Sequence, residues 1–263
     1  MISRSPTYAL PSYARLIWVF LNFALGLFPA VLFFIWIERN TALPYLPIEF
    51  GWPWYTLPPT SAAAAVLWNL ILILGFGASH TIFAQANAVR TLEKIFPPQT
   101  IRTVYMMITG VAVLLVMGLW QHTGIILWNL PLPGHYTQAL SIAIYYSLMS
   151  MAGRQAGLFD IWQFIGLRQL YSFAKDTGAQ VGNPELITTG YFKHVRHPVY
   201  TITLCAFIAA PMMSLDRLVV IAGSLLYLAV GIPIEEKKLF TTFGENYKRY
   251  QAQVPAILPR FLK

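Results

Sequence analysis

Apolar residues along the chain are gathered in runs that polar, charged or proline-containing segments separate. A transmembrane helix needs about 20 predominantly apolar residues, and about 17 is the lower limit. Three runs reach that length without a break, and the positions of prolines and charges divide the remaining apolar sequence into three more. The predicted spans are Leu16–Trp36, Ala62–Phe83, Thr103–Trp120, Tyr136–Gly153, Val199–Met213 and Leu218–Ile234.

The last two runs are shorter than the others, and Ser214-Leu215-Asp216-Arg217 joins them. At about 1.5 Å per residue they extend over about 22 and about 25 Å, which is less than the hydrocarbon core of about 30 Å. This pattern predicts a tight helical hairpin that tilts or lies inside a protein wall. Pro233 removes a backbone hydrogen bond directly before Glu235-Glu236, so the second helix is predicted to be interrupted where charge appears.

The segment Gln155–Lys175 mixes aromatic and leucine side chains with basic residues. Such a composition is typical of a helix that lies in the membrane interface, here on the cytoplasmic side. This helix either anchors the protein or forms a lid or substrate ramp. The sequence thus predicts an all-α polytopic membrane protein with about six transmembrane helices. Residues 1–153 form a four-helix membrane region, and residues 154–263 add the interfacial helix, hairpin and cytoplasmic tail within one integrated domain.

Composition and charge distribution support a membrane location. Residues of the set AVILMFWYC make up 57% of the chain and charged residues only 11%, which excludes a disordered chain and most soluble domains. In a soluble protein a formal net charge of +8 would suggest nucleic acid, but 16 of the 18 Lys and Arg residues lie in alternate loops. By the positive-inside rule both termini, Arg90–Arg102 and Arg154–Arg196 are cytoplasmic. Membrane lipid is then the expected partner, and neither nucleic acid nor a protein partner is required.

Ionisable residues gather at the cytoplasmic ends of the last two spans. Arg196 and His197 precede the fifth span, while Glu235-Glu236-Lys237-Lys238 follows the sixth. The predicted hairpin folds these two ends together. Charges this close to hydrocarbon indicate function by default, although acids and lysines at a helix end also mark a membrane interface. The lone Cys205 lies in an apolar run, so neither a disulfide framework nor a cysteine metal site is expected.

Several motifs occur around this cluster in a fixed order. They are RHPxY at 196–200, then the hairpin, EExxL at 235–239, FGxxY at 243–247 followed by Tyr250, and VPxxxP at 254–259. This order resembles the isoprenylcysteine carboxyl methyltransferase superfamily over about residues 190–259. Nearer the N-terminus, Ser79–Ala84, Arg102, Tyr105 and Phe164–Gln169 resemble the bacterial methanethiol S-methyltransferases and their NnrU-type relatives rather than the prenyl-protein enzymes.

The resemblance implies an S-adenosyl-L-methionine site enclosed by the RHPxY segment and the tail. Physical chemistry agrees, because a sulfonium cation favours aromatic faces and carboxylates, and adenine favours an apolar slot. The helix that begins at His197-Pro198 also offers backbone amide groups for the cofactor carboxylate. The residues expected to bind the cofactor are His197, Pro198, Tyr200, Glu235, Leu239, Tyr247 and Tyr250.

Methyl transfer to a thiol is an in-line displacement that requires a dry, ordered pocket and no metal. A small thiol ionises poorly at neutral pH, so a base or a positive charge should assist it. The candidates are Glu236 or His80 as the base, with Arg196 stabilising the thiolate. The sequence leaves the choice of base open. Gln253 stands where the family commonly has a basic residue, which puts the acceptor type in doubt.

The expected function is S-adenosylmethionine-dependent S-methylation of a small thiol, with methanethiol converted to dimethyl sulfide as the specific expectation. The expected location is the bacterial inner membrane, with the active site on the cytoplasmic side. One alternative is a methyltransferase for a lipophilic carboxylate or thiol. Another is a haem-binding protein similar to NnrU and the zeta-carotene isomerases, with His80 as an axial ligand. A scaffold or transporter is less well supported because no inverted repeat is visible.

Overall fold

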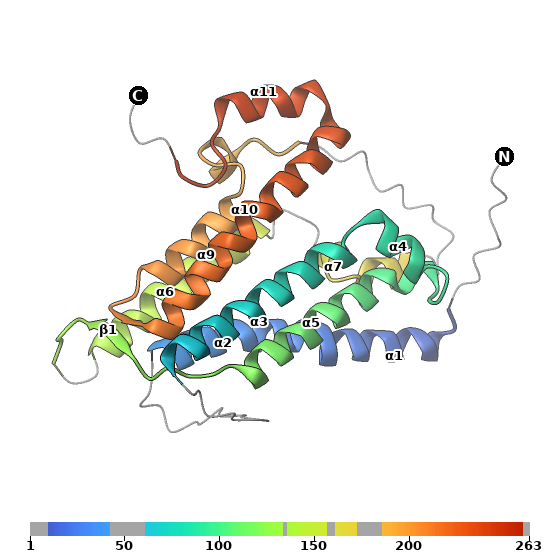
Figure 1. Cartoon of the computed structure of the whole chain (residues 1–263). Coiled ribbons are helices and arrows are strands. Elements are labelled where there is room, and N and C mark those ends of the chain that lie inside the picture. The colour runs from blue at the N-terminus through green and yellow to red at the C-terminus, as the bar shows by residue number, and fades with distance from the viewer. Residues whose placement is uncertain (1–9, 43–60, 134–135, 157–160, 173–185, 260–263) are drawn as a thin grey trace. The chain divides into compact units, whose positions relative to one another are not determined.

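The computed structural model describes residues 10–42, 61–133, 136–156, 161–172 and 186–259, and they are mostly helical (Figure 1). A single antiparallel pair of short strands, β1 (Ile126–Asn129) and β2 (Met212–Ser214), is present in these ranges. The helical elements are α1 (Ser12–Asn22), η1 (Phe23–Leu27), α2 (Phe28–Ala42), α3 (Ala62–Phe83), α4 (Ala86–Leu92), η2 (Pro98–Thr100), α5 (Ile101–Leu119), α6 (Tyr136–Ala156), α7 (Ile161–Phe164), α8 (Leu167–Ser172), η3 (Gly190–Lys193), α9 (Pro198–Ile208), α10 (Leu215–Phe243) and α11 (Glu245–Gln253).

Four helical stretches in the described ranges are long and apolar enough to cross a membrane: Ser12–Ile37, Ala62–Phe83, Pro98–Leu119 and Leu215–Phe243. This finding confirms an all-α type of membrane protein. The fourth and fifth predicted spans are helical over α6 and α9, but α6 has several serines and α9 has only 11 residues. The six spans and the short hairpin therefore stay predictions.

The described chain forms two compact units. The first contains the described parts of Met1–Phe33, Ala78–Leu115 and Asp160–Pro184. In this unit α5 approaches the first helical stretch so closely that a side chain at Gly110 would collide with the carbonyl group of Leu25. A glycine at this position lets the two backbones come into contact, as is common between membrane helices.

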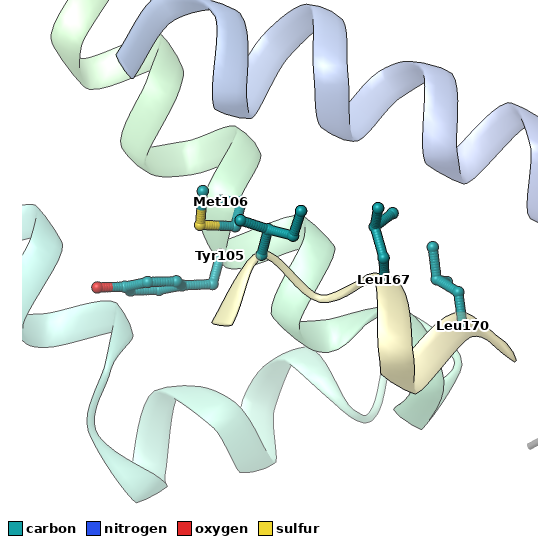
Figure 2. Close-up of a cluster of buried hydrophobic side chains, with 5 residues drawn as sticks. Tyr105, Met106, Leu167 and Leu170 are labelled. Carbon is teal, nitrogen blue, oxygen red and sulfur yellow. The ribbon is translucent and has the colours of Figure 1, made fainter. Parts of the chain in front are cut away.

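The expected interfacial helix at Gln155–Lys175 is not one continuous helix. The first unit contains α7 and α8, which are separated at Gly166, where φ is +87°. The side chains of Ile165, Leu167 and Leu170 are buried against Tyr105 and Met106 (Figure 2). These apolar groups therefore pack within the protein, where lipid cannot reach them. Residues 157–160 and 173–175 of the expected helix lie outside the described residues.

The second unit contains α6, α9, α10 and α11, and Figure 1 shows α9 and α10 side by side. Leu204 of α9 packs against Leu228 and Ile232 of α10 in a buried cluster. The predicted helix Val199–Met213 is too long, because α9 ends at Ile208 and residues 212–214 form β2, which pairs with β1. Pro211 explains this end, since the residue before a proline is disfavoured in helical geometry.

The predicted interruption at Pro233 is wrong. Helix α10 has 29 residues and continues past Pro233 to Phe243. Leu228 and Ile232 pack within the second unit, and a proline inside a membrane helix can be tolerated when its surroundings satisfy the freed carbonyl. The helix ends only at Gly244, whose φ of +56° favours glycine. The acidic pair Glu235-Glu236 therefore lies on a rigid helix.

The opposite end of α10 holds a buried polar network instead of the predicted loop. Ser214 caps the helix by accepting a hydrogen bond from the amide of Arg217 at 3.1 Å. Asp216 accepts hydrogen bonds from Trp120 Nε1 at 3.3 Å and from the backbone and hydroxyl of Thr123 at 3.2 Å. Arg217 is fully buried and donates to the carbonyl of Phe207 at 2.9 Å. Arg217 thus ties the start of α10 to the end of α9, and Asp216 ties it to Trp120 and Thr123.

Candidate functional site

Three elements of the second unit bring the RHPxY and EExxL motifs together. Pro198 occupies the first turn of α9, where its missing amide costs no helical hydrogen bond, and His197 is the residue that precedes the helix. The uninterrupted α10 supplies the two glutamates. Figure 1 shows α11 turning away from the end of α10, and Gly244 makes this turn. We call Arg196, His197, Glu235 and Glu236 the charge cluster.

Arg196 and Glu236 form the centre of the charge cluster. Arg196 Nε lies 2.7 Å and Nη2 2.6 Å from Glu236 Oε1, and the two side chains are only 10% and 12% exposed. The remaining nitrogen, Nη1, donates to the backbone carbonyls of Gln251, at 3.2 Å, and of Val254. A guanidinium group presents its donors in a fixed planar fork, so Arg196 holds α10 and the tail in one defined geometry.

Both oxygens of Glu236 are occupied. His197 Nε2 lies 3.2 Å from Oε1, and Gln251 Nε2 donates to Oε2 at 2.7 Å. The sequence offered no motif that marks Gln251. Gln251 lies four residues after Tyr247 on α11, so both are on one face of the helix. This spacing is the only feature of the sequence that could have indicated Gln251. Donors at both oxygens hold this carboxylate in one orientation.

Glu235 is more open than Glu236. Its side chain is 45% exposed, and its Oε2 accepts a hydrogen bond from the hydroxyl of Tyr200 at 2.9 Å. The Tyr200 ring stacks on His197 with 5.5 Å between centroids, and His197 Nδ1 lies 3.7 Å from Glu235 Oε2. An exposed carboxylate beside aromatic rings is an arrangement that can bind a cation.

The aromatic residues of α11 are buried beside the charge cluster. Tyr247 and Tyr250 pack with Leu239 and Val254, and Tyr250 donates to the carbonyl of Phe192 at 2.6 Å. Burial, with the nearby charge of Glu236, raises the pKa of Tyr247 to about 12, and burial raises the pKa of Tyr250 to about 12. Both phenols therefore stay neutral at physiological pH.

The tail after α11 is paired with the stretch that precedes α9. The amide of Arg196 donates to the carbonyl of Pro255 at 2.8 Å, and the amide of His197 donates to Ala256 at 3.0 Å. The hydroxyl of Thr201 donates to the carbonyl of Ile257 at 2.9 Å. The amides of Arg196 and His197 are therefore engaged by the tail, and the expectation that amides at the start of α9 bind a cofactor carboxylate stays a prediction.

His80 belongs to the first unit. Its ring nitrogens lie 3.0 Å from the hydroxyl of Tyr105, and Nδ1 lies 3.3 Å from Thr109 Oγ1. The structure thus brings together the predicted residues of the RHPxY and EExxL motifs, while His80 has its own polar partners on α5. Within the described ranges, no group of three or more His, Cys, Asp or Glu residues is arranged to hold a metal ion.

Comparisons with known proteins place these residues in a family context. The family described as "Protein of unknown function (DUF1295)" matches residues 98–254. The chain is similar to the methanethiol S-methyltransferase of Crocosphaera subtropica, at 27% identity over 76% of each chain. The corresponding protein of Mycobacterium tuberculosis is 26% identical over 74% of this chain and 78% of its own length. Nurim from Rattus norvegicus is 26% identical over 75% and 74%. No solved structure matches.

Proposed function

The chain belongs to the DUF1295 family, within the isoprenylcysteine carboxyl methyltransferase-like superfamily, and on that premise we propose that it is a membrane S-adenosyl-L-methionine-dependent methyltransferase. The names of its curated relatives support a membrane methyltransferase. The observation that carries the proposal is the meeting of Arg196, His197 and both glutamates, which come from motifs about 40 residues apart.

The residues present fit a sulfonium methyl donor. Glu235 presents a half-exposed carboxylate, and the aromatic ring of Tyr200 lies beside it. Leu239, Tyr247 and Tyr250 belong to an adjoining apolar cluster, beside which the proposal places the adenine ring. S-adenosyl-L-methionine, when bound, supplies an electrophilic methyl group on a positively charged sulfur. Glu235 and Tyr200 would attract that charge, while His197 and Pro198 fix the start of α9 beside it.

We propose that Arg196 and Glu236 fix the geometry of the site and do not transfer a proton. Glu236 accepts hydrogen bonds at both oxygens, so it orients Arg196 and His197. The proposal leaves open which base takes the proton of the acceptor thiol; His80, the other candidate, lies in the first unit, where its imidazole is within hydrogen-bonding distance of Tyr105 and Thr109. Loss of this proton leaves the thiolate as the nucleophile that accepts the methyl group. The positive charge of Arg196 favours the same thiolate.

The proposed acceptor is a small thiol, with methanethiol giving dimethyl sulfide as the specific case. The printed names of several relatives support this choice. We place the protein in the bacterial inner membrane with both termini and the charge cluster on the cytoplasmic side, because 16 of 18 Lys and Arg residues fall in alternate loops. Membrane lipid surrounds the spans, and the proposal requires neither nucleic acid nor a protein partner.

Calorimetric titration with S-adenosylhomocysteine tests the donor site. Wild-type protein should bind this product in detergent and in lipid, and Tyr200→Phe should weaken binding about tenfold because it removes a hydrogen bond to a charged group. Tyr191→Phe is the matched control, since Tyr191 is an exposed tyrosine of η3. Wild-type protein that ignores the ligand in several detergents and in lipid would refute the methyltransferase proposal.

Headspace gas chromatography of cells fed different thiols tests the acceptor. Methanethiol should yield dimethyl sulfide. Loss of this product in His80→Ala, with binding of S-adenosylhomocysteine retained, would identify His80 as the base. If methanethiol gives no product while lipophilic thiols or carboxylates become methylated, the reaction class stands and the small-thiol assignment fails. A variant His80→Ala with full activity would remove His80 from the mechanism.

A further inference from the structure

A glutamine that no motif includes makes a direct contact with the charge cluster. Gln251 lies on the last turn of α11, and its amide nitrogen is 2.7 Å from Glu236 Oε2. The backbone carbonyl of the same residue accepts a hydrogen bond from Arg196 Nη1 at 3.2 Å. Gln251 therefore touches both members of the central ion pair, once through its side chain and once through its backbone.

The geometry of Glu236 explains what this contact does. Arg196 and His197 both reach Oε1, so without Gln251 the second oxygen has no donor among the hydrogen bonds seen in the described residues. A carboxylate held at one oxygen can rotate about its terminal bond, which is a soft torsion. The donor at Oε2 fixes this rotation and keeps Oε1 directed at Arg196 and His197. His197 in turn lies beside Glu235 and stacks on Tyr200, so the orientation of Glu236 affects both of these residues.

We propose that Gln251 is a positioning residue, which locks the Glu236 carboxylate so that Arg196 and His197 hold Glu235 and Tyr200 in the geometry that binds the methyl donor. This inference rests on the proposed function for its effect on ligand binding. Gln251 itself is exposed and acts through Glu236. Because water reaches the amide, its removal should weaken binding by about threefold to about tenfold, less than loss of a fully buried charged hydrogen bond.

The residue can be tested because glutamate has nearly the same shape as glutamine. In Gln251→Glu the protonated carboxyl group can donate to Glu236 Oε2 and restore the contact, whereas the ionised group places two negative charges side by side. The titratable groups that face Glu236 are Arg196 and His197 from the stretch before α9, Glu235 from α10, and Tyr247 and Tyr250 from α11. All are shared with wild type, so the ratio between the two proteins isolates residue 251.

The experiment measures the Kd for S-adenosylhomocysteine between about pH 5.5 and about pH 8, a range in which a carboxyl group beside a like charge titrates. Gln251→Leu should bind several-fold more weakly at every pH. Gln251→Glu should approach wild type at the acidic end and bind more than about tenfold more weakly at the alkaline end. Asn246→Leu, which removes an exposed amide side chain from the same helix, should match wild type.

Two results overturn the inference: a Gln251→Glu protein whose Kd follows the wild-type pH curve, or an Asn246→Leu protein that is as impaired as Gln251→Leu. Unfolding midpoints without added ligand separate this inference from the proposed function. The midpoint of Gln251→Glu should fall relative to wild type as pH rises, whatever the protein binds. Wild-type protein that binds no S-adenosylhomocysteine refutes the proposed function and the role of Gln251 in ligand binding. Equal unfolding midpoints for Gln251→Glu and wild type at all pH values refute the claim that Gln251 fixes the orientation of Glu236.

Discussion

Replacing Arg196 with lysine preserves the positive charge and removes the fork that joins three parts of the site. Arg196 reaches Glu236 through two nitrogens and the carbonyls of Gln251 and Val254 through the third. A lysine ammonium group can keep one ion pair with Glu236 but cannot also reach both carbonyls in this planar geometry. The change therefore separates the effect of charge from the effect of shape.

The expected cost follows from the hydrogen bonds that lysine cannot make. A hydrogen bond that involves a charged group contributes about 1.5–3 kcal/mol, and the Arg196 side chain is only 10% exposed, so water has little access to replace it. Because two carbonyl groups lose their hydrogen-bond donor and relaxation recovers part of the cost, binding of the methyl donor should weaken by about 2–4 kcal/mol. This corresponds to a loss of about 30-fold to about 800-fold in affinity.

Titration with S-adenosylhomocysteine and the unfolding midpoint should be measured on the same detergent preparation of Arg196→Lys. Arg249→Lys is the matched control, because Arg249 is exposed on α11 and donates to its neighbour Asn246 at 2.7 Å. The control should bind as wild type does. Affinity of Arg196→Lys within about threefold of wild type would show that charge alone is sufficient and would refute the requirement for a planar fork.

Three further changes test the fold around the site. Asp216→Ala leaves the donors of Trp120 and Thr123 unsatisfied and should destabilise the protein by about 2–4 kcal/mol in a denaturant titration, while Asp216→Asn, which keeps an acceptor, should cost less. Gly244→Ala should cost about 1–3 kcal/mol from its φ of +56° alone, since no atom lies within 4 Å of the added carbon; an unchanged midpoint would contradict this. Burial raises the pKa of Tyr250 from 10.0 to about 12. The neutral phenol therefore contributes its full stabilisation below pH 10, and this stabilisation is lost as pH rises through 12. In a denaturant titration, the free energy of unfolding of Tyr250→Phe should fall less over this alkaline range than that of wild type.

The apolar pattern predicted the helical class well, and failed where local rules compete with packing. Pro233 alone predicts an interruption, yet the packed helix continues through it. The pair Asp216-Arg217 looks like a solvated turn in the sequence. Its burial depends on acceptors and donors from α9 and from Trp120 and Thr123, which no local pattern reveals. The strands β1 and β2 are too short to leave a periodic signal.

The sequence could predict the part of the candidate site whose residues belong to recognisable motifs. The RHPxY and EExxL segments indicated that Arg196, His197 and the glutamates meet, and the structure brings them together. Sequence reasoning could not foresee that Glu236 is fully engaged, because this depends on Gln251, a polar residue on a polar helix with no distinguishing pattern. The use of the Arg196 and His197 amides by the tail was hidden for the same reason: backbone pairing leaves no mark in residue types.

The pairing of residues 255–257 with residues 196–201 has a consequence for biosynthesis. The apolar helices that precede α9 in the chain can be inserted in the bilayer before residue 255 is translated. The amides of Arg196 and His197, however, find their acceptors only once the ribosome has passed that codon. A chain truncated before residue 255 would therefore keep its apolar helices and lose the acceptors of these two amides, and its ligand affinity would show how far the site depends on the tail.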